Sequence, residues 1–168
     1  MALSMYQASV PVFVKTLGNL AAILDKAASF AAAKKVDQSV LLGYRLAPDM
    51  LNLARQVQIA TDHAKGTPAW LAGMEPPSYE DTEASFAELK ARIDKTIAFL
   101  GTLKPAQVDG SEEREITLKM RSSTFSYKGQ PYLLHFALPN FFFHVTTAYN
   151  ILRHCGVELG KKDYIGQV

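Results

Sequence analysis

The chain has 168 residues, of which 48% are apolar and 20% are charged, and its formal net charge at pH 7 is +2. This length and composition indicate one folded domain over residues 1–168 and exclude a disordered chain. The 18 basic and 16 acidic residues are mixed along the chain, so no basic surface of the kind that binds DNA or RNA is expected.

Two further features of the sequence bear on the cellular location of the protein. The single cysteine, Cys155, cannot form an internal disulfide, which is typical of a reducing cytoplasm. The N-terminus lacks the charged and apolar regions of a signal peptide, and no run of about 18 apolar residues predicts a membrane span. We therefore expect a cytoplasmic protein of bacterial type that does not bind membranes.

Apolar residues recur at spacings of three and four in four segments, which predicts four amphipathic helices. The first covers residues 4–33, and its regular part begins near Pro11. A connection with at most one helical turn leads to Pro48, a suitable first-turn residue for the second helix, which ends around Gly66. Residues 69–81 contain Gly73, Pro76 and Pro77, which interrupt helices, and are predicted to form a long crossing loop.

The second half of the chain adds a different pattern. Capping residues at 82–85 begin a third helix, and Gly101 ends it. The segments REITLKM and STFSYKG alternate apolar and polar residues, which predicts a β-hairpin. A lone hairpin is marginal in water, so it should lie against the helices. The fourth helix follows Gly129 and Pro131 and runs to Gly156, which completes an all-α four-helix bundle with a small β-hairpin before its last helix.

The fourth helix carries the best candidate site. Pro139 cannot donate to the carbonyl of His135 and crowds it, so we expect a kink there and a carbonyl that needs another partner. Asn140 and His144 lie about 40° apart on one face, where they can share a ligand or bond each other. The alternative is a purely structural kink, with His144 as a core residue whose ring nitrogens find partners inside the protein.

A second helix would have to supply further ligands, and its candidates lie in QVQIATDHAKG. If Val57 is the centre of the buried face, Asp62 lies about 140° from it and His63 about 120° from it on the other side. Both side chains should then point outward, and Gln58, at about 100°, is at the margin. Metal sites in bundles need inward ligands from facing helices, so the spacing alone argues only weakly for a metal.

The chain resembles an uncharacterised bacterial family, domain of unknown function one-nine-nine-three, which is grouped with the DinB/YfiT-like superfamily. The resemblance covers nearly the whole chain. It implies a four-helix bundle with a long crossover between its second and third helices, and a homodimer. It rests on four stretches: ASVPVFVKTLGNLAAILDKA, RLAPDMLNLARQVQIATDHAK, LAGMEPPSYEDTEASFAELKARIDKTIAFL and YLLHFALPNFFFHVTTAYNILRHCGVELGKKDYIG.

The resemblance also implies a site. Many superfamily members hold a divalent metal on three histidines, one from the second helix and two, spaced HxxxH, from the fourth, and some use it to activate a low-molecular-weight thiol. Carried onto this chain, the HxxxH pair falls on Asn140 and His144, and the second-helix histidine falls near Asp62 or His63. Because an amide replaces one imidazole, a harder and weaker-bound ion, or none, is implied.

Two functions follow as alternatives, and whether the protein is an enzyme is left open. In the first, a divalent metal such as zinc or nickel, or a small molecule, binds between the second and fourth helices at His144, Asn140 and Asp62 or His63, and a thiol or water is activated there. In the second, the bundle holds no metal and acts as a binding or dimeric structural module. The first predicts a pocket walled by aromatic residues such as Phe141, Phe142, Phe143, Tyr132 and Tyr149.

Overall fold

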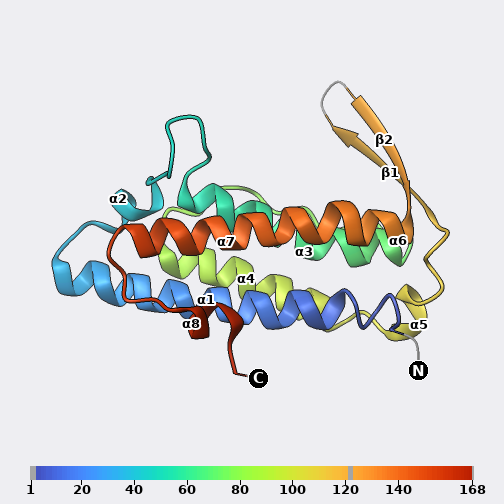
Figure 1. Cartoon of the computed structure of the whole chain (residues 1–168), viewed down its shortest axis with the longest axis horizontal. Coiled ribbons are helices and arrows are strands. Elements are labelled where there is room, and N and C mark those ends of the chain that lie inside the picture. The colour runs from blue at the N-terminus through green and yellow to red at the C-terminus, as the bar shows by residue number, and fades with distance from the viewer. Residues whose placement is uncertain (1–2, 121–122, 168) are drawn as a thin grey trace.

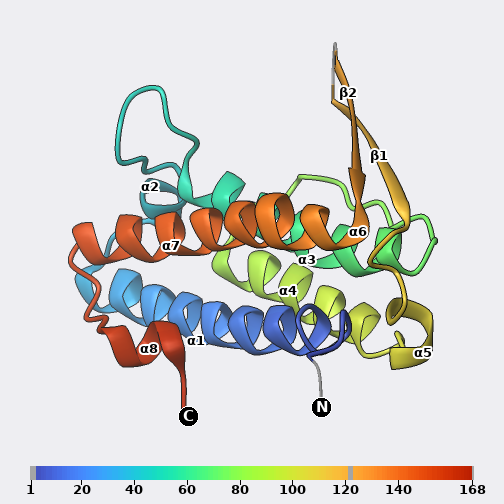
Figure 2. The ribbon, with the colours of Figure 1, turned by 45° about the vertical axis from the view of Figure 1, so that its right-hand side comes forward.

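The fold is described from a computed structural model for residues 3–120 and 123–167. It is mostly helical with one small antiparallel sheet, as the sequence predicts. The four longest helices lie side by side (Figures 1 and 2): α1 (Val10–Lys34), α3 (Leu53–Leu71), α4 (Phe86–Leu100) and α7 (Leu138–His154). The described residues also form short helices that were not all expected: α2 (Gln38–Leu42), α5 (Pro105–Val108), α6 (Gly129–Pro131) and α8 (Lys161–Ile165). None of these helices combines the length and the apolar character needed to cross a membrane.

Local capping decides where the long helices begin. The side chain of Asn52 accepts a backbone N–H of the first turn of α3, so this helix begins at Leu53 and the expected start at Pro48 was wrong. The expected end at Gly66 was also wrong, because α3 continues to Leu71. The starts of α1 near its proline and of α4 after a serine cap agree with the sequence.

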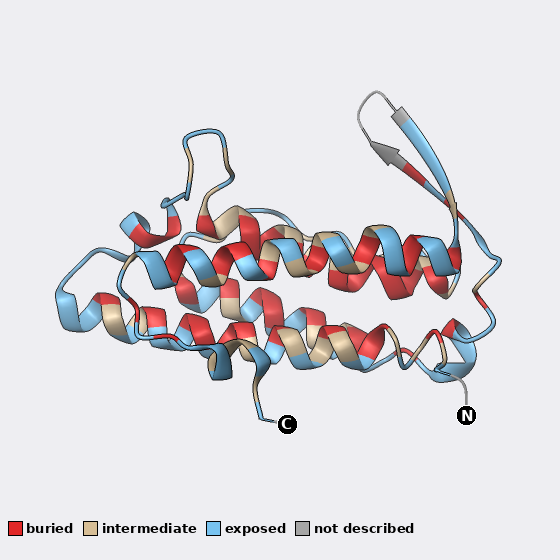
Figure 3. Ribbon diagram, in the orientation of Figure 1, coloured by how far each residue is buried: buried red, intermediate tan, exposed pale blue. Residues whose placement is uncertain are grey.

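The inward faces of the four long helices enclose the main apolar core, as Figure 3 shows by the buried faces. Residues from the predicted stripes form it, among them Phe13, Leu17, Val57, Ile93 and Phe141. A smaller cluster, formed at the end of the bundle that carries the hairpin, includes Leu71, Ile116, Leu118, Tyr132 and Leu133.

The predicted hairpin is present but leans on the helices only at its base. Strand β1 (Glu115–Met120) pairs antiparallel with β2 (Ser123–Lys128), and Leu118 stands opposite Phe125. Ile116 and Leu118 are buried in the smaller cluster, whereas Phe125 is 43% exposed. The two strands project away from the helices (Figures 1 and 2), so the expectation that the hairpin lies along them holds for its base alone.

The chain accommodates Pro139 by a change of helix type. A π-helical turn, η1 (Tyr132–Ala137), leads into α7 and places the proline in the first turn of α7. A π-helix bonds each residue to the fifth preceding one, which relieves the clash that a proline ring makes with the fourth preceding carbonyl. The side-chain amide of Asn140 donates to the carbonyl of Phe136 at 2.7 Å, one residue beyond the His135 carbonyl that was expected to need a partner.

The C-terminal tail, in which the sequence shows no periodicity, folds back onto α1. Its short helix α8 lies against α1, where the side chain of Asn19 donates to the carbonyl of Tyr164 at 2.9 Å. Lys26 and Asp163 form an ion pair of 2.7 Å across the same contact. The tail is therefore held by these polar contacts and by apolar ones, because Val157 and Leu159 are buried in the main core and Tyr164 packs against it.

Candidate functional site

Two of the predicted site residues meet between α3 and α7. The imidazole rings of His63 and His144 are stacked, with centroids 5.9 Å apart and planes 19° from parallel. The expectation that His63 points outward was wrong. Thirteen of the nineteen residues of α3 are buried, so this helix has no single apolar stripe from which an outward direction could be measured.

Both imidazoles are neutral at pH 7. Burial lowers the pKa of His144 below its ordinary value. The pKa of His63 falls to about 4, first because the ring is buried and second because of repulsion from His144, while the carboxylate of Asp62 acts in the opposite direction. A neutral imidazole has one bare nitrogen that can accept a hydrogen bond or a proton, or bind a metal.

Gln56, which was not predicted from the sequence as a site residue, contacts one ring of the histidine pair. Its side-chain oxygen lies 2.7 Å from Nδ1 of His144, and its side-chain nitrogen donates to the carbonyl of Leu51 at 3.0 Å. The side chain is 1% exposed. A signal for it was present in the sequence, since Gln56 precedes His63 by about two helical turns and so shares its face.

The other two predicted ligands are held by groups of the chain itself. Asn140 bonds to the backbone, as described above. The Oδ1 atom of Asp62 lies 2.8 Å from Nη2 of Arg92 and 3.0 Å from Nζ of Lys65. In the part of the chain that the structure describes, no three His, Cys, Asp or Glu side chains come together in a way that could hold a metal ion.

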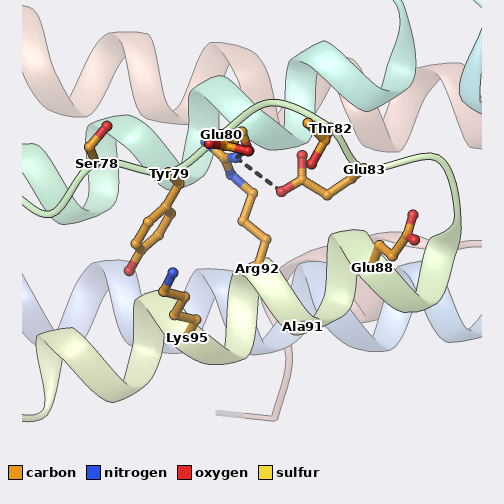
Figure 4. A pocket seen from close by; sticks show the side chains of 9 residues that line it. All are labelled: Ser78, Tyr79, Glu80, Thr82, Glu83, Glu88, Ala91, Arg92 and Lys95. Carbon is orange, nitrogen blue, oxygen red and sulfur yellow. Dashed lines mark hydrogen bonds and ion pairs between the residues drawn. The ribbon is translucent and has the colours of Figure 1, made fainter.

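Arg92 of α4 ties the segment that connects α3 and α4 to the bundle (Figure 4). Its side chain is only 2% exposed. An arginine has five N–H donors, and the guanidinium is surrounded by acceptors. These are Thr61 Oγ1 at 2.7 Å, the Glu80 carbonyl at 2.9 Å, Glu83 Oε1 at 3.0 Å, Asp62 Oδ1 at 2.8 Å and Asp81 Oδ1 at 3.1 Å.

A cavity of ≈ 500 Å³ lies beside this arginine, lined by Tyr79 and Lys95 among others (Figure 4). The Tyr79 ring is stacked under the Lys95 ammonium, with Nζ 4.2 Å from the ring centroid. The donors of Arg92 are matched by acceptors of the chain, so the guanidinium itself has little left to offer a ligand in this cavity. The arginine is a structural clamp.

A second cavity, of ≈ 480 Å³, opens beside the histidine pair. Its lining comes from α3, η1, the base of the hairpin and the α3–α4 connection: Asp62, His63, Trp70, Glu75, Thr117, Leu118 and Phe136. The rings of Phe136 and His63 meet edge to face at 6.1 Å. This size and this mixture of aromatic walls with a few polar groups are usual for small-molecule sites.

The aromatic walls are not the predicted ones. Phe141 is fully buried in the main core and Phe143 is 55% exposed, whereas Trp70 and Phe136 line the cavity. The three consecutive phenylalanines were expected to wall the pocket together. On a helix, consecutive residues point about 100° apart, so they cannot line one wall.

Comparisons with known proteins extend these observations. The family described as Domain of unknown function (DUF1993) matches residues 5–165. The crystal structure of a DinB family member protein from Shewanella denitrificans has a TM-score of 0.87 and 43% sequence identity, over 97% of this chain and 92% of that chain. None of the curated proteins matches the sequence.

Proposed function

This chain belongs to the DUF1993 family and has a DinB-like fold, and we propose that it binds a small molecule between α3 and α7, at His63 and His144. One observation carries the proposal. Two neutral, stacked imidazoles lie partly buried between α3 and α7, and one of them, His63, borders an aromatic-walled cavity of ≈ 480 Å³. A ligand with a thiol, hydroxyl or ammonium group would find an aromatic enclosure and a neutral imidazole acceptor there.

The architecture around the site is part of the same proposal. The helices α1, α3, α4 and α7 correspond to the four helices of a DinB/YfiT-like bundle, and residues 72–85 correspond to its long crossover. The supporting observations are that the four helices lie side by side and that the connection is held in place by the buried Arg92.

The three-histidine metal set of the superfamily does not fit the side chains present. Two imidazoles are in place, but the third position is Asn140, whose amide donates to a backbone carbonyl. The nearby carboxylate of Asp62 is paired with two cations. Zinc and nickel sites are built from imidazole, thiolate and carboxylate donors, so the proposed chemistry uses the imidazoles alone.

The pKa values favour binding over proton transfer. A general base works best when its pKa lies near the working pH. A His63 imidazole with a pKa of about 4 accepts a hydrogen bond at pH 7 but takes up a proton only weakly. Activation of a thiol or water would therefore fall to His144.

Ligand-observed NMR with a fragment library tests the proposal on the full chain. Fragments that bind the wild-type protein should lose binding in His63→Phe and His144→Phe. They should keep it in His135→Phe, which changes an exposed histidine of η1. The absence of any fragment that depends on the pair would overturn the proposal.

Elemental analysis by mass spectrometry, on protein purified without chelators or a His tag, tests the metal separately. Near-stoichiometric zinc, nickel or manganese that disappears in His144→Ala would contradict the argument from the donor set. That result would support the metal-dependent function that the family resemblance implies.

The alternative function is a module without catalysis, and one observation favours it. Nδ1 of His144 is already paired with Gln56, so the ring could be a satisfied interior group. A metal-free binding or dimeric structural module of this kind is expected to hold no stoichiometric metal and to lose much of its stability in His144→Ala. The homodimer and the cytoplasmic location stay predictions, and light scattering of the purified protein would test the first.

A further inference from the structure

We propose that Gln56 is a positioning residue that sets the tautomer of His144, holding the proton on Nδ1 and leaving Nε2 bare. The assignment stands on the hydrogen bonds of Gln56 itself. Its consequence for ligand choice rests on the proposed function.

The orientation of the Gln56 amide is fixed by its second partner. The nitrogen of the amide faces the carbonyl of Leu51 at 3.0 Å, and a carbonyl can only accept. A flipped amide would place two oxygens against each other at Leu51 and lose this bond. The side-chain oxygen must therefore be the atom that faces His144, at 2.7 Å from Nδ1.

This orientation leaves His144 one choice. The amide oxygen of Gln56 has no hydrogen to give, so the short contact is a hydrogen bond only if Nδ1 carries the proton. Burial lowers the pKa of His144, so the ring is neutral near pH 7 and Nε2 then has no proton. Since Gln56 is 1% exposed, water has little access to replace it as the acceptor.

The tautomer decides what kind of ligand the histidine can bind. A bare Nε2 accepts from a thiol, a hydroxyl or an ammonium group, and it repels a carbonyl or carboxylate oxygen. The inverse tautomer would reverse this preference. Gln56 would thus favour hydrogen-bond donors among the ligands that reach Nε2 of His144, without touching them itself.

The test is a long-range proton–nitrogen NMR spectrum of the histidine side chains in the full-length, ligand-free protein at neutral pH. Nδ1 of His144 should show the signature of a protonated nitrogen, and Nε2 that of a bare one. In Gln56→Met, which keeps the volume but removes the acceptor, the population protonated on Nδ1 should fall. In Gln56→Glu, whose carboxylate still accepts, it should remain and the pKa of His144 should rise.

A matched control is available on the same helix. Gln58 is also buried, at 3% exposure, but its amide bonds to Arg55 and Glu83. Gln58→Met should leave the His144 tautomer unchanged. A wild-type His144 protonated on Nε2, or a Gln56→Met tautomer like that of the wild type, would overturn the inference. Should Gln56→Met fail to fold, the wild-type and Gln56→Glu spectra still decide it.

Failure of this inference can be told apart from failure of the proposed function. The NMR spectrum concerns the protein without a ligand. If His144 has the expected tautomer but no fragment binds, only the proposed function fails. If fragments bind and depend on the histidine pair, but Gln56→Met does not alter the tautomer, only the role of Gln56 fails.

Discussion

The imidazole of His63 lies face to face with that of His144, at 5.9 Å between ring centroids. At this separation a charge on one ring disfavours a charge on the other, and burial disfavours both charges. The folded protein therefore favours the neutral form of both rings. This makes the stability of the whole protein sensitive to pH.

We expect the free energy of unfolding to fall as the pH is lowered from about 6.5 to about 4. Because the pKa of His63 in the folded chain is about 4, against 6.5 ordinarily, the unfolded chain binds a proton in this window that the folded chain does not. The loss from this residue is at most about 3.5 kcal/mol, at roughly 1.4 kcal/mol for each pKa unit. Urea unfolding at a series of pH values measures it.

Carboxylates also begin to titrate near the lower end of this window, so the variant His63→Phe isolates the contribution of the histidine. Its stability should depend less on pH than that of the wild type, whereas His135→Phe should behave like the wild type. Parallel curves for the wild type and His63→Phe would show that the pair does not carry the effect.

The clamp made by Arg92 gives a second prediction. Arg92→Met should lower the free energy of unfolding by about 2–3 kcal/mol, because Asp62, Asp81 and Glu83 lose their shared cation. The value is lower than is usual for a broken buried ion pair, since two of these carboxylates are about 40% exposed and can be hydrated. Lys90→Met, which removes the surface ion pair with Asp25, should have little effect. Equal losses in the two variants would contradict the view of Arg92 as a clamp.

A third prediction concerns the approach of two backbones at the base of the hairpin. A Cβ atom on Gly129 would lie 2.0 Å from the carbonyl oxygen of Ser111, so one of the two segments would have to move. Gly129→Ala should therefore destabilise the protein by about 2–3 kcal/mol. Gly18→Ala in α1, where nothing lies within 4 Å of the added Cβ, should instead stabilise it by about 0.5–1 kcal/mol. Thermal unfolding of both variants would show whether the signs differ as expected.

The buried hydroxyls of Thr67 and Tyr132 allow a double-mutant test. Both residues are fully buried and their oxygens lie 3.4 Å apart. Tyr132→Phe alone should cost about 1 kcal/mol, because the Thr67 hydroxyl loses its partner. Adding Thr67→Val should restore much of the loss, since neither polar group then remains. Denaturant unfolding of the two single variants and the double variant measures the coupling, and strictly additive losses would rule the pairing out.

Periodicity predicted the fold well where a helix buries one side. The stripe of α1, with Phe13, Leu17 and Leu24, matches the main core, and the serine cap and glycine end of α4 were read correctly. The same reasoning failed on α3, because neighbours cover most of its circumference and buried polar residues such as Gln56 interrupt the pattern. Boundaries there depend on tertiary contacts that a local pattern does not contain.

The candidate site was predicted only in part, for a related reason. His144 and Asn140 were found because they lie four residues apart on one helix, and His63 was suggested by the family resemblance. Gln56 and Trp70 were missed because their roles depend on how α3 sits against α7 and the hairpin. The register between two packed helices is set by their side-chain contacts, and it cannot be inferred from the residue spacing within either helix.

The contact between Gln56 and His144 joins residues 88 positions apart in the sequence. Closing so long a loop has an entropic cost, which the packing of α7 against α3 helps to offset. A growing chain on the ribosome would lack the site until α7 has been released. A ligand that binds the pair would then stabilise the completed fold over any partly folded state in which α7 is not yet packed against α3.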